Sequence, residues 1–294
     1  MTAKQIKYLI GIFVAVLLLI VVNSYQRQPG AVLGTFSARS TSSLELIFFD
    51  VGQGDSSLII APDGEDILVD GGPDNGVLYG LGKYLPPTDR TIELVILSHP
   101  HSDHVAGLVE VLRRYRVEKI IMTGAGHVAP DYSEFLKLIE EKRIPVEIID
   151  RPQEEIIGGL TLQFLTPENN LSGERPANLN NSSIVFKLVY GSTTALYTGD
   201  FENEESLLLQ SRVKLQSGVL KIGHHGSTNA NSKGFLQAVA PAYAVVSVGA
   251  DNQYGHPHYR TLYYLKELGT RVFRTDSDGD VRLLSDGQDF APAD

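Results

Sequence analysis

The sequence predicts an α/β protein in which two β-sheets are covered by helices. Of its 294 residues, 43% are hydrophobic and 20% are charged, which is the composition of a globular protein with a large core. Strand-type segments recur from residue 44 onward, and segments with helical spacing lie between them in both halves of the chain. Many strands with interspersed helices are typical of sheets that bury their faces under helices.

Two hydrophobic periodicities predict the elements. Short runs rich in β-branched and aromatic residues predict strands at Leu44–Phe49, Ser57–Ala61, Asp66–Asp70, Ile92–Ser98, Lys119–Thr123, Val146–Ile149, Leu160–Leu165, Ser183–Tyr190, Thr194–Thr198, Val219–Ile222, Ala244–Val248, Val272–Arg274 and Val281–Leu284. Apolar residues three and four apart predict helices at Val105–Tyr115, Ser133–Glu141, Glu204–Arg212, Lys233–Val239 and Arg260–Leu268. We expect a hairpin turn around Asp278 and Gly279, between the last two strands.

An uninterrupted apolar run of 15 residues, Tyr8–Val22, lies near the N-terminus. As a helix it would span about 22 Å, less than the ~30 Å hydrocarbon core of a bilayer, so it fits a short membrane anchor or a signal-peptide core. A buried N-terminal helix of the domain is the remaining alternative. Lys4 and Lys7 precede the run, and the positive-inside rule then places the rest of the chain outside the cytoplasm, tethered to the cell membrane by one span or secreted. We therefore expect an anchor or signal segment at 1–25, a polar linker at 26–43 and one domain at 44–294.

Composition excludes several kinds of chemistry. The chain has no cysteine, so it has no disulfide, iron-sulfur cluster or thiol nucleophile, and any metal must be held by His, Asp or Glu. The formal net charge is -10, but residues 1–43 carry four basic side chains and no acid, which leaves 21 basic against 35 acidic side chains in the domain. A net charge of -14 disfavours bulk electrostatic binding of nucleic acid.

The segment Leu94–Gly107, LVILSHPHSDHVAG, predicts a metal site. A buried-type strand ends there in His99, His101, Asp103 and His104 just before a helix begins. On such a tight connection the two leading histidines can hold one ion while Asp103 and His104 hold a second ion. Imidazole and carboxylate together are the ligands expected for zinc or manganese. A helix cap alone would leave three clustered imidazoles unexplained.

This H-x-H-x-D-H pattern resembles the signature of the metallo-β-lactamase superfamily. The resemblance implies an αββα four-layer sandwich with its site along one edge. Asp70 in LVDGG matches an aspartate that orients the ligands, and Asp200 in LYTGD matches the carboxylate that bridges the two ions. His224 and His225 in KIGHHGS match the last motif, in which one histidine completes the second ion. Strand alternation puts His225 on the face of Lys221, so His225 is the predicted ligand, with His224 beside it or on the substrate.

Six segments in order narrow the resemblance. They are DVGQGD at Asp50–Asp55, SHPHSDH, NNSS at Asn180–Ser183, TGD, KIGHHGS, and YGHPH at Tyr254–His258. Together they resemble the extracytoplasmic nuclease-like domain of ComEC-type DNA-uptake competence proteins. Here the domain comes after a single apolar segment rather than the large multi-span channel of those proteins, so the resemblance extends to the chemistry and not to DNA import.

The ligand set of the first ion departs from the pattern of other superfamily members. The histidine expected between His104 and Asp200 has one candidate, His127, which comes after a strand in GAGH and is better explained as a loop residue. NNSS occupies the position where that ligand is expected and brings Asn181 nearby. The first ion would then have the two leading histidines of the cluster, Asp200 and water, which predicts that one of the two sites is weak.

The resemblance implies a metal-dependent hydrolase, most simply a phosphodiesterase or nuclease in which two divalent ions, zinc or manganese, activate a water. The candidate catalytic residues are Asp103, Asp200 and His256, with His258 beside the substrate. Lys221 is either a phosphate contact or a solvent-facing lysine at the strand edge. With Lys233 and Arg260 it could form a small basic patch, enough for short single-stranded DNA. The alternatives are hydrolysis of a small or cell-wall phosphoester, and a metal-binding module without turnover.

Overall fold

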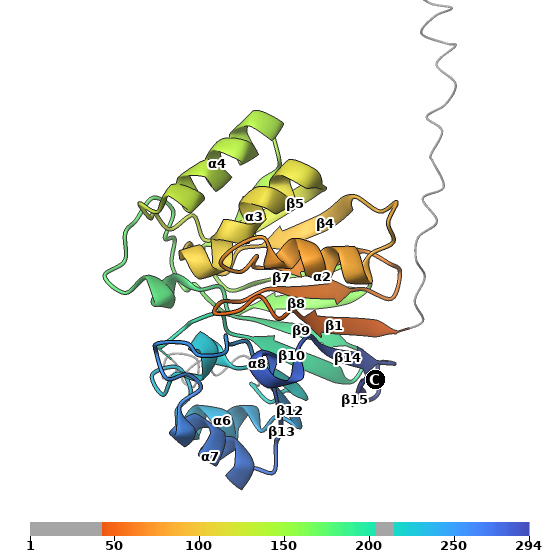
Figure 1. Ribbon diagram of the computed structural model, residues 1–294, viewed down its shortest axis with the longest axis vertical. Coiled ribbons are helices and arrows are strands. Elements are labelled where there is room, and N and C mark those ends of the chain that lie inside the picture. The colour runs from red at the N-terminus through yellow and green to blue at the C-terminus, as the bar shows by residue number, and fades with distance from the viewer. Residues whose placement is uncertain (1–42, 204–214, 294) are drawn as a thin grey trace, which may run out of the picture. The chain divides into compact units, whose positions relative to one another are not determined.

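Two β-sheets face each other in the computed structural model, which describes residues 43–203 and 215–293 of the chain (Figure 1). The predicted anchor or signal segment, the linker up to residue 42 and the predicted helix Glu204–Arg212 lie outside the described residues. Within the described part, no helix is long and apolar enough to cross a membrane. The predicted span Tyr8–Val22 therefore stays a prediction.

The first sheet has eight strands in the order β15-β14-β1-β2-β3-β4-β5-β6. Their bounds are β1 Leu44–Phe48, β2 Ser57–Ile60, β3 Asp66–Val69, β4 Thr91–Ile96, β5 Arg116–Met122, β6 Val146–Ile148, β14 Val281–Ser285 and β15 Phe290–Pro292. Strands β3 to β6 pair in parallel, whereas β15, β14, β1, β2 and β3 pair antiparallel.

The second sheet has seven strands in the order β13-β12-β11-β10-β9-β8-β7. Their bounds are β7 Gln153–Ile157, β8 Leu160–Phe164, β9 Phe186–Tyr190, β10 Thr193–Tyr197, β11 Val219–Lys221, β12 Tyr243–Val246 and β13 Arg271–Arg274. Strands β10 to β13 pair in parallel and β7 to β10 pair antiparallel.

Helices cover the outer face of each sheet (Figure 1). Helices α2 (Gly76–Tyr84), α3 (Ser102–Arg114) and α4 (Pro130–Lys142) cover the first sheet, and α6 (Lys233–Val239) and α7 (Tyr259–Glu267) cover the second. Short helical turns are η1 (Leu179–Ser182), η2 (Gly223–Gly226) and α8 (Thr275–Asp278). Three buried apolar clusters separate the layers, one under each helical layer and one between the sheets. The predicted four-layer αββα arrangement is confirmed.

Strand β1 illustrates how the sequence builds these layers. Because successive side chains of a strand point to opposite faces, Leu46 and Phe48 join the cluster between the sheets, while Ile47 joins the cluster under α2 and α3. All three side chains are fully buried. An apolar run without alternation is therefore expected for a strand covered on both faces.

The structure corrects several sequence expectations. The helices α2 and α8, the strands β7 and β15 and the 3-10 turns η1 and η2 were not predicted. Strand β9 begins at Phe186 rather than Ser183, because residues 179–182 form a 3-10 turn. The expected hairpin around Asp278 and Gly279 is wrong, because β13 and β14 belong to different sheets and α8 lies between them.

The parallel strands position the site. Asp70 comes after β3, His99 after β4, Asp200 after β10 and His225 after β11. Carboxyl ends of parallel strands meet at one edge of a sheet. In this fold the edges of both sheets adjoin, since Asp103, just beyond β4, lies 3.2 Å from His225, just beyond β11.

Candidate metal centre

Four side chains from both halves of the chain meet at this edge. They are Asp103 and His104 in the first turn of α3, Asp200 after β10 and His225 after β11. His225 Nε2 lies 3.2 Å from Asp103 Oδ2 and 3.6 Å from Asp200 Oδ2. His104 Nε2 lies 3.4 Å from Asp200 Oδ2 and 3.9 Å from Asp103 Oδ2. We call these four residues the ligand group.

The spacing of the ligand group fits a divalent transition metal. Four atoms at ~2.1 Å from a tetrahedral zinc lie about 3.4 Å from one another, which is the range that the four contacts span. His104 Nε2 and Asp200 Oδ1 are buried without a hydrogen-bond partner in the protein, although such groups are normally satisfied. Two neutral imidazole nitrogens and two carboxylates are the donors that zinc or manganese accepts. These residues would hold the predicted second ion.

His99 and His101 form a separate pair beside the ligand group. His99 Nε2 lies 2.9 Å from His101 Nδ1, and the His99 ring lies 4.2 Å from the His104 ring between centroids. Within residues 43–203 and 215–293, no set of three close potential ligands includes either histidine. The predicted first ion therefore has a pair of facing nitrogens here, without a third donor at the same spacing.

His127 and Asn181 lie in different places relative to this pair. The His127 ring is 5.6 Å from the His101 ring, so the loop residue reaches the rim of the site. Asn181 Oδ1 instead accepts a 3.0 Å hydrogen bond from the backbone of Glu202, two residues after Asp200. Asn181 thus holds the loop that carries Asp200.

Asp70 holds the ring of His104 in place through a contact with its Nδ1. Its Oδ2 lies 2.9 Å from His104 Nδ1, and it accepts 2.7 Å hydrogen bonds from the backbone and hydroxyl of Ser98. A side chain on Gly71 or Gly107 would collide with the neighbouring segment, so these glycines let α3 approach the turn after β3. Because Nδ1 is engaged by Asp70, Nε2 is the nitrogen left to face the ligand group, which is the orienting role expected of Asp70.

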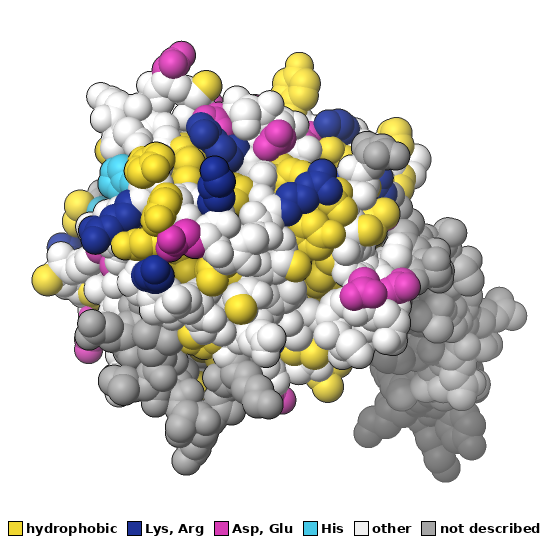
Figure 2. Space-filling view, turned by 90° about the horizontal axis from the view of Figure 1, so that it is seen from below, with side chains coloured by type: hydrophobic (Ala, Val, Ile, Leu, Met, Phe, Trp, Pro, Cys, Tyr) yellow, Lys and Arg dark blue, Asp and Glu magenta, His cyan; other side chains and the backbone are white. Residues whose placement is uncertain are grey.

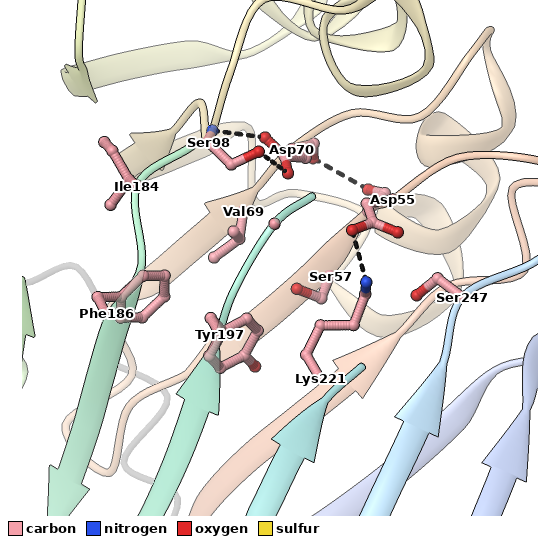
Figure 3. Close-up of a pocket in the computed structure, with 12 residues that line it drawn as sticks. Asp55, Ser57, Val69, Asp70, Ser98, Ile184, Phe186, Tyr197, Lys221 and Ser247 are labelled. Carbon is pink, nitrogen blue, oxygen red and sulfur yellow. Dashed lines mark hydrogen bonds and ion pairs between the residues drawn. The ribbon is translucent and has the colours of Figure 1, made fainter. Parts of the chain in front are cut away.

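A buried ion pair supports His225. Lys221 Nζ lies 2.6 Å from Asp55 Oδ2 (Figure 3). Asp55 Oδ1 in turn lies 3.3 Å from His225 Nδ1. His225 Nδ1 also lies 3.0 Å from the carbonyl of Ser247. The expectation that Lys221 contacts phosphate or faces solvent is wrong. Since β11 lies inside the sheet, its lysine is 4% exposed and points to Asp55.

The two adjacent histidines are separated by a turn and not by strand alternation. β11 ends at Lys221, and both His224 and His225 adopt left-handed backbone angles, with φ of 46° and 53°. His225 is buried within the ligand group, whereas His224 Nδ1 lies 2.8 Å from Glu202 and its Nε2 lies 3.9 Å from Asp200. The expected placement of the two side chains matches the structure, although the alternation argument does not.

His256 lies next to His224, and His258 lies next to His256. The His256 ring is 5.5 Å from that of His224 and 6.3 Å from that of His225, and its buried Nδ1 has no hydrogen-bond partner in the protein. His258 Nδ1 accepts a 3.1 Å hydrogen bond from the backbone of Thr228. His256 therefore faces the site, while His258 holds the turn that carries the histidine pair.

Opposite charges balance within the ligand group. Burial by itself lowers the pKa of His225, but Asp200, Asp103 and Asp55 outweigh it and raise that pKa to about 10. Burial also opposes charge on His104, yet Asp200, Asp103 and Asp70 hold its pKa well above 6.5. Although burial alone would raise the pKa of the Asp200 carboxyl, His225 and His104 hold it well below its usual range.

Three histidines outside the ligand group, His99, His101 and His256, have lowered pKa values. Burial first, then His104, lowers the pKa of His99 well below 6.5, and burial also lowers that of His101. Burial and the neighbouring His225 and His224 lower the pKa of His256 to about 4. At neutral pH these three imidazoles are neutral, so each has one unprotonated nitrogen.

We expect binding of one ion at the ligand group to release about two protons at pH 7, because ligating imidazoles must be neutral and both His104 and His225 are imidazolium in the metal-free protein. Their pKa values are raised, so the competing protons are bound at pH 7 and leave as the pH rises toward about 10 for His225. Affinity should thus increase with pH, by about tenfold per pH unit for each ligating imidazolium that is still protonated. Titration calorimetry of manganese binding in buffers of different ionisation enthalpy counts the protons. His256→Ala should leave the count unchanged, whereas release of less than one proton would contradict the assignment.

An open cleft of about 700 Å³ begins at His101. His127, Arg175, Asn178 and Asn180 line it further out. Among the described residues of its lining, Arg175 is the only Lys or Arg. The cleft can admit an extended substrate beside the His99–His101 pair, with one guanidinium available to an anionic group.

Sequence reasoning missed three residues of the site. Asp55 holds His225 and Glu202 holds His224, and both stand inside the sequence motifs or next to them, in DVGQGD and after TGD. Nothing in the sequence indicated that Arg175 lies at the site, because the segment around it has neither periodicity nor a motif. Two carboxylates facing a histidine pair could have been inferred from the motifs alone.

Two sheets between helical layers, with a His and Asp cluster at their common edge, define an αββα protein with a candidate metal centre. Residues 49–250 match the Metallo-beta-lactamase superfamily, and the chain belongs to that superfamily. The family expected from the H-x-H-x-D-H signature is confirmed.

Curated relatives agree with the narrower resemblance. ComE operon protein 3 of Bacillus subtilis is 30% identical over 263 residues, which cover 82% of this chain and 33% of that protein. Competence protein ComA of Neisseria gonorrhoeae is 30% identical over 279 residues, which cover 92% of this chain and 37% of that protein. The resemblance to ComEC-type proteins is confirmed, and the chain spans about a third of the length of these relatives.

Solved structures share the fold. YhfI of Bacillus subtilis, a metallo-beta-lactamase fold protein, superposes with a TM-score of 0.54 at 17% identity, covering 81% of this chain and 99% of that one. Tm1679, described as a metal-dependent hydrolase of the β-lactamase superfamily, has a TM-score of 0.54 at 16% identity, covering 82% and 98%. At these identities the likeness concerns the fold alone.

Proposed function

We propose that this protein is a metal-dependent phosphodiesterase that cleaves DNA, with single-stranded DNA as its better substrate. The observation that carries the proposal is the ligand group, in which Asp103, His104, Asp200 and His225 lie at metal-ligand spacing beside the facing nitrogens of His99 and His101. The similarity to competence proteins favours DNA among the phosphodiesters.

Each side chain has a distinct task in hydrolysis. A bound divalent ion lowers the pKa of water and neutralises charge on a phosphoryl oxygen. Asp200 contacts His104 and His225 and lies on the His99 side of the group, so it is suited to join the two candidate ion positions. Asp103 accepts a hydrogen bond from His225 in the metal-free protein and, as a ligand, would help to hold the ion that activates the attacking water.

His256 acts as a neutral donor in this proposal. Its pKa of about 4 makes it a neutral imidazole at pH 7, which can donate one N–H to a phosphate oxygen but holds no second proton for the leaving group. Arg175 would bind a neighbouring phosphate from the cleft. We propose two ions, zinc or manganese, with the weaker one at the His99–His101 pair.

One observation favours a second candidate, hydrolysis of a small or cell-wall phosphoester. The domain carries a net charge of -14, and the described lining of the cleft has Arg175 as its only Lys or Arg, whereas a nuclease usually shows a basic groove. The similarity to competence proteins outweighs this charge argument, because it extends over most of the chain.

Cleavage rates distinguish these candidates. The full chain, loaded with manganese, should cut single-stranded DNA faster than duplex DNA, and less at moderate than at low salt. It should also hydrolyse bis(p-nitrophenyl) phosphate. Hydrolysis of the small ester without cleavage of either DNA would favour the second candidate. Bound metal without any hydrolysis would indicate a binding module that lacks turnover.

We also propose that the domain lies outside the cytoplasm, tethered to the membrane by Tyr8–Val22 unless that segment is cleaved. Lys4 and Lys7 on the N-terminal side support this orientation. Protease added to spheroplasts should degrade the domain. Complete protection until lysis would place it in the cytoplasm.

A further inference from the structure

Helix α7 and the loop before it present tyrosines to solvent. Tyr254 is 63% exposed, Tyr259 is 80% exposed and Tyr263 is 44% exposed. Large aromatic side chains are normally buried for most of their surface, so three such rings on one segment form an unusual surface. Figure 2 views this face from below, with hydrophobic side chains lying among Lys and Arg side chains. We call Tyr254, Tyr259 and Tyr263 the tyrosine face.

Ring contacts connect the tyrosine face to the metal centre. Tyr254 stacks on His256 with 5.8 Å between ring centroids and 23° between planes, and His256 in turn lies 6.3 Å from His225 of the ligand group. On the helix, Tyr259 and Tyr263 are one turn apart with their centroids 6.1 Å from each other. A strand stacked on Tyr254 would therefore lie beside the site, and Tyr259 begins α7 directly after the loop that carries Tyr254.

The charge of this face differs from that of the domain as a whole. Lys233, Arg260 and Lys266 are exposed here, against the acids Glu267 on α7 and Asp251 in the loop. Glu267 is already engaged by Lys233 at 3.1 Å and by the Tyr263 hydroxyl at 2.8 Å, which fixes the ring of Tyr263. The face is thus locally cationic, although the domain carries -14.

We propose that the tyrosine face is a stacking platform for single-stranded nucleic acid, on which bases lie against Tyr254 and Tyr259 while the adjoining phosphates meet Arg260 and Lys266. This inference rests on the proposed phosphodiesterase function and adds the surface that holds the strand beyond the cleaved bond. Exposed rings interleaved with cations are what single strands require, because each base offers a π-face and each phosphate a negative charge. A duplex hides its base faces, so the platform explains a preference for single strands.

The test measures binding without cleavage. The full chain, treated with EDTA, is titrated against a fluorescein-labelled oligothymidylate of about 12 nucleotides, and anisotropy gives the dissociation constant. Tyr259→Ala and Tyr254→Ala should each weaken binding about tenfold, because a base loses its stacking partner. Tyr259→Phe should bind like the unchanged protein, since the ring rather than the hydroxyl makes the contact.

Controls separate this surface from the catalytic centre. Tyr79→Ala removes a tyrosine that is 88% exposed on α2, over the other sheet, and should leave binding unchanged. Tyr259→Ala should hydrolyse bis(p-nitrophenyl) phosphate at the unchanged rate. A lower rate with this small ester would show that the substitution had disturbed the metal centre. If the proposed function is wrong, the unchanged protein will not cleave DNA, and that result does not depend on the tyrosine variants.

Two results would overturn the platform. One is equal oligothymidylate binding by Tyr259→Ala and the unchanged protein, or no binding by either. The other is binding to vesicles of equal parts phosphatidylcholine and phosphatidylglycerol that Tyr259→Ala abolishes while DNA binding persists. That outcome would assign the same tyrosines and cations to a membrane surface.

Discussion

Asp200→Ala is expected to lower phosphodiester hydrolysis by roughly 10³-fold or more, because a ligand worth several kcal/mol of charge stabilisation is lost. The Asp200 carboxylate lies 3.4 Å from His104 and 3.6 Å from His225, so its removal takes away one of the two ligand-group carboxylates that contact both buried imidazolium groups. Metal content per chain should fall with activity. Rates with bis(p-nitrophenyl) phosphate and elemental analysis of the purified full-length variant measure both losses.

The matched control for this variant is Asp289→Ala. Asp289 is exposed in the turn between β14 and β15, at the end of the sheet where β1 begins, whereas the site lies beyond the ends of β3 and β4. It should keep normal activity and metal content. Asp103→Ala should resemble Asp200→Ala, since both carboxylates face His225. Full activity in either ligand-group variant would remove the basis of the metal assignment.

Lys221→Met is expected to destabilise the domain by about 3–5 kcal/mol, because it takes the ammonium group from the buried Asp55 carboxylate and leaves only the more distant His225 beside it. Asp55 and Lys221 are both almost fully buried and lie 2.6 Å apart. Urea unfolding of the metal-free protein, followed by circular dichroism, measures the loss. Combining Lys221→Met with Asp55→Asn removes both charges and should restore most of the stability.

Lys83→Met provides the comparison at the surface. Lys83 also pairs with an aspartate, Asp280, at 2.7 Å, but its side chain is 60% exposed. Exposed pairs contribute about 1 kcal/mol or less, so this variant should unfold almost like the unchanged protein. Equal losses in Lys83→Met and Lys221→Met would show that burial of the Asp55 pair has no energetic consequence.

The fold could be predicted from sequence where one local pattern determines one element. Strand β1 is apolar at most of its positions because it is covered on both faces, so its segment is easily recognised. β7 reads QEEII, with Glu154 and Ile156 exposed at the sheet edge, so it carries little apolar signal. The turn at Asp278 and Gly279 fits a hairpin locally. Nothing in the turn residues says which sheet the next strand joins, and here it joins the other one.

Within the candidate site, too, local sequence patterns identify some residues and not others. Asp103 and His104 are adjacent in sequence to the other histidines of their motif, so local reasoning finds them. The burial of Lys221 could not be found, because its partner Asp55 comes from the first motif of the domain and meets it only through sheet packing. The roles of His224 and His225 depend on two left-handed residues, which replace the strand alternation assumed for them.

The ligand group joins segments that are far apart in the chain. Asp103 and His225 are separated by 122 residues, and the chain has no cysteine with which to form a covalent link. In the chain-entropy model, a permanent link that closes a loop of about 100 residues stabilises a fold by about 4.7 kcal/mol. An ion bound by Asp103 and His225 would close such a loop reversibly. It would act as a removable cross-link between the two halves of the domain. The concentration of free metal around the protein would therefore set the stability of the folded chain.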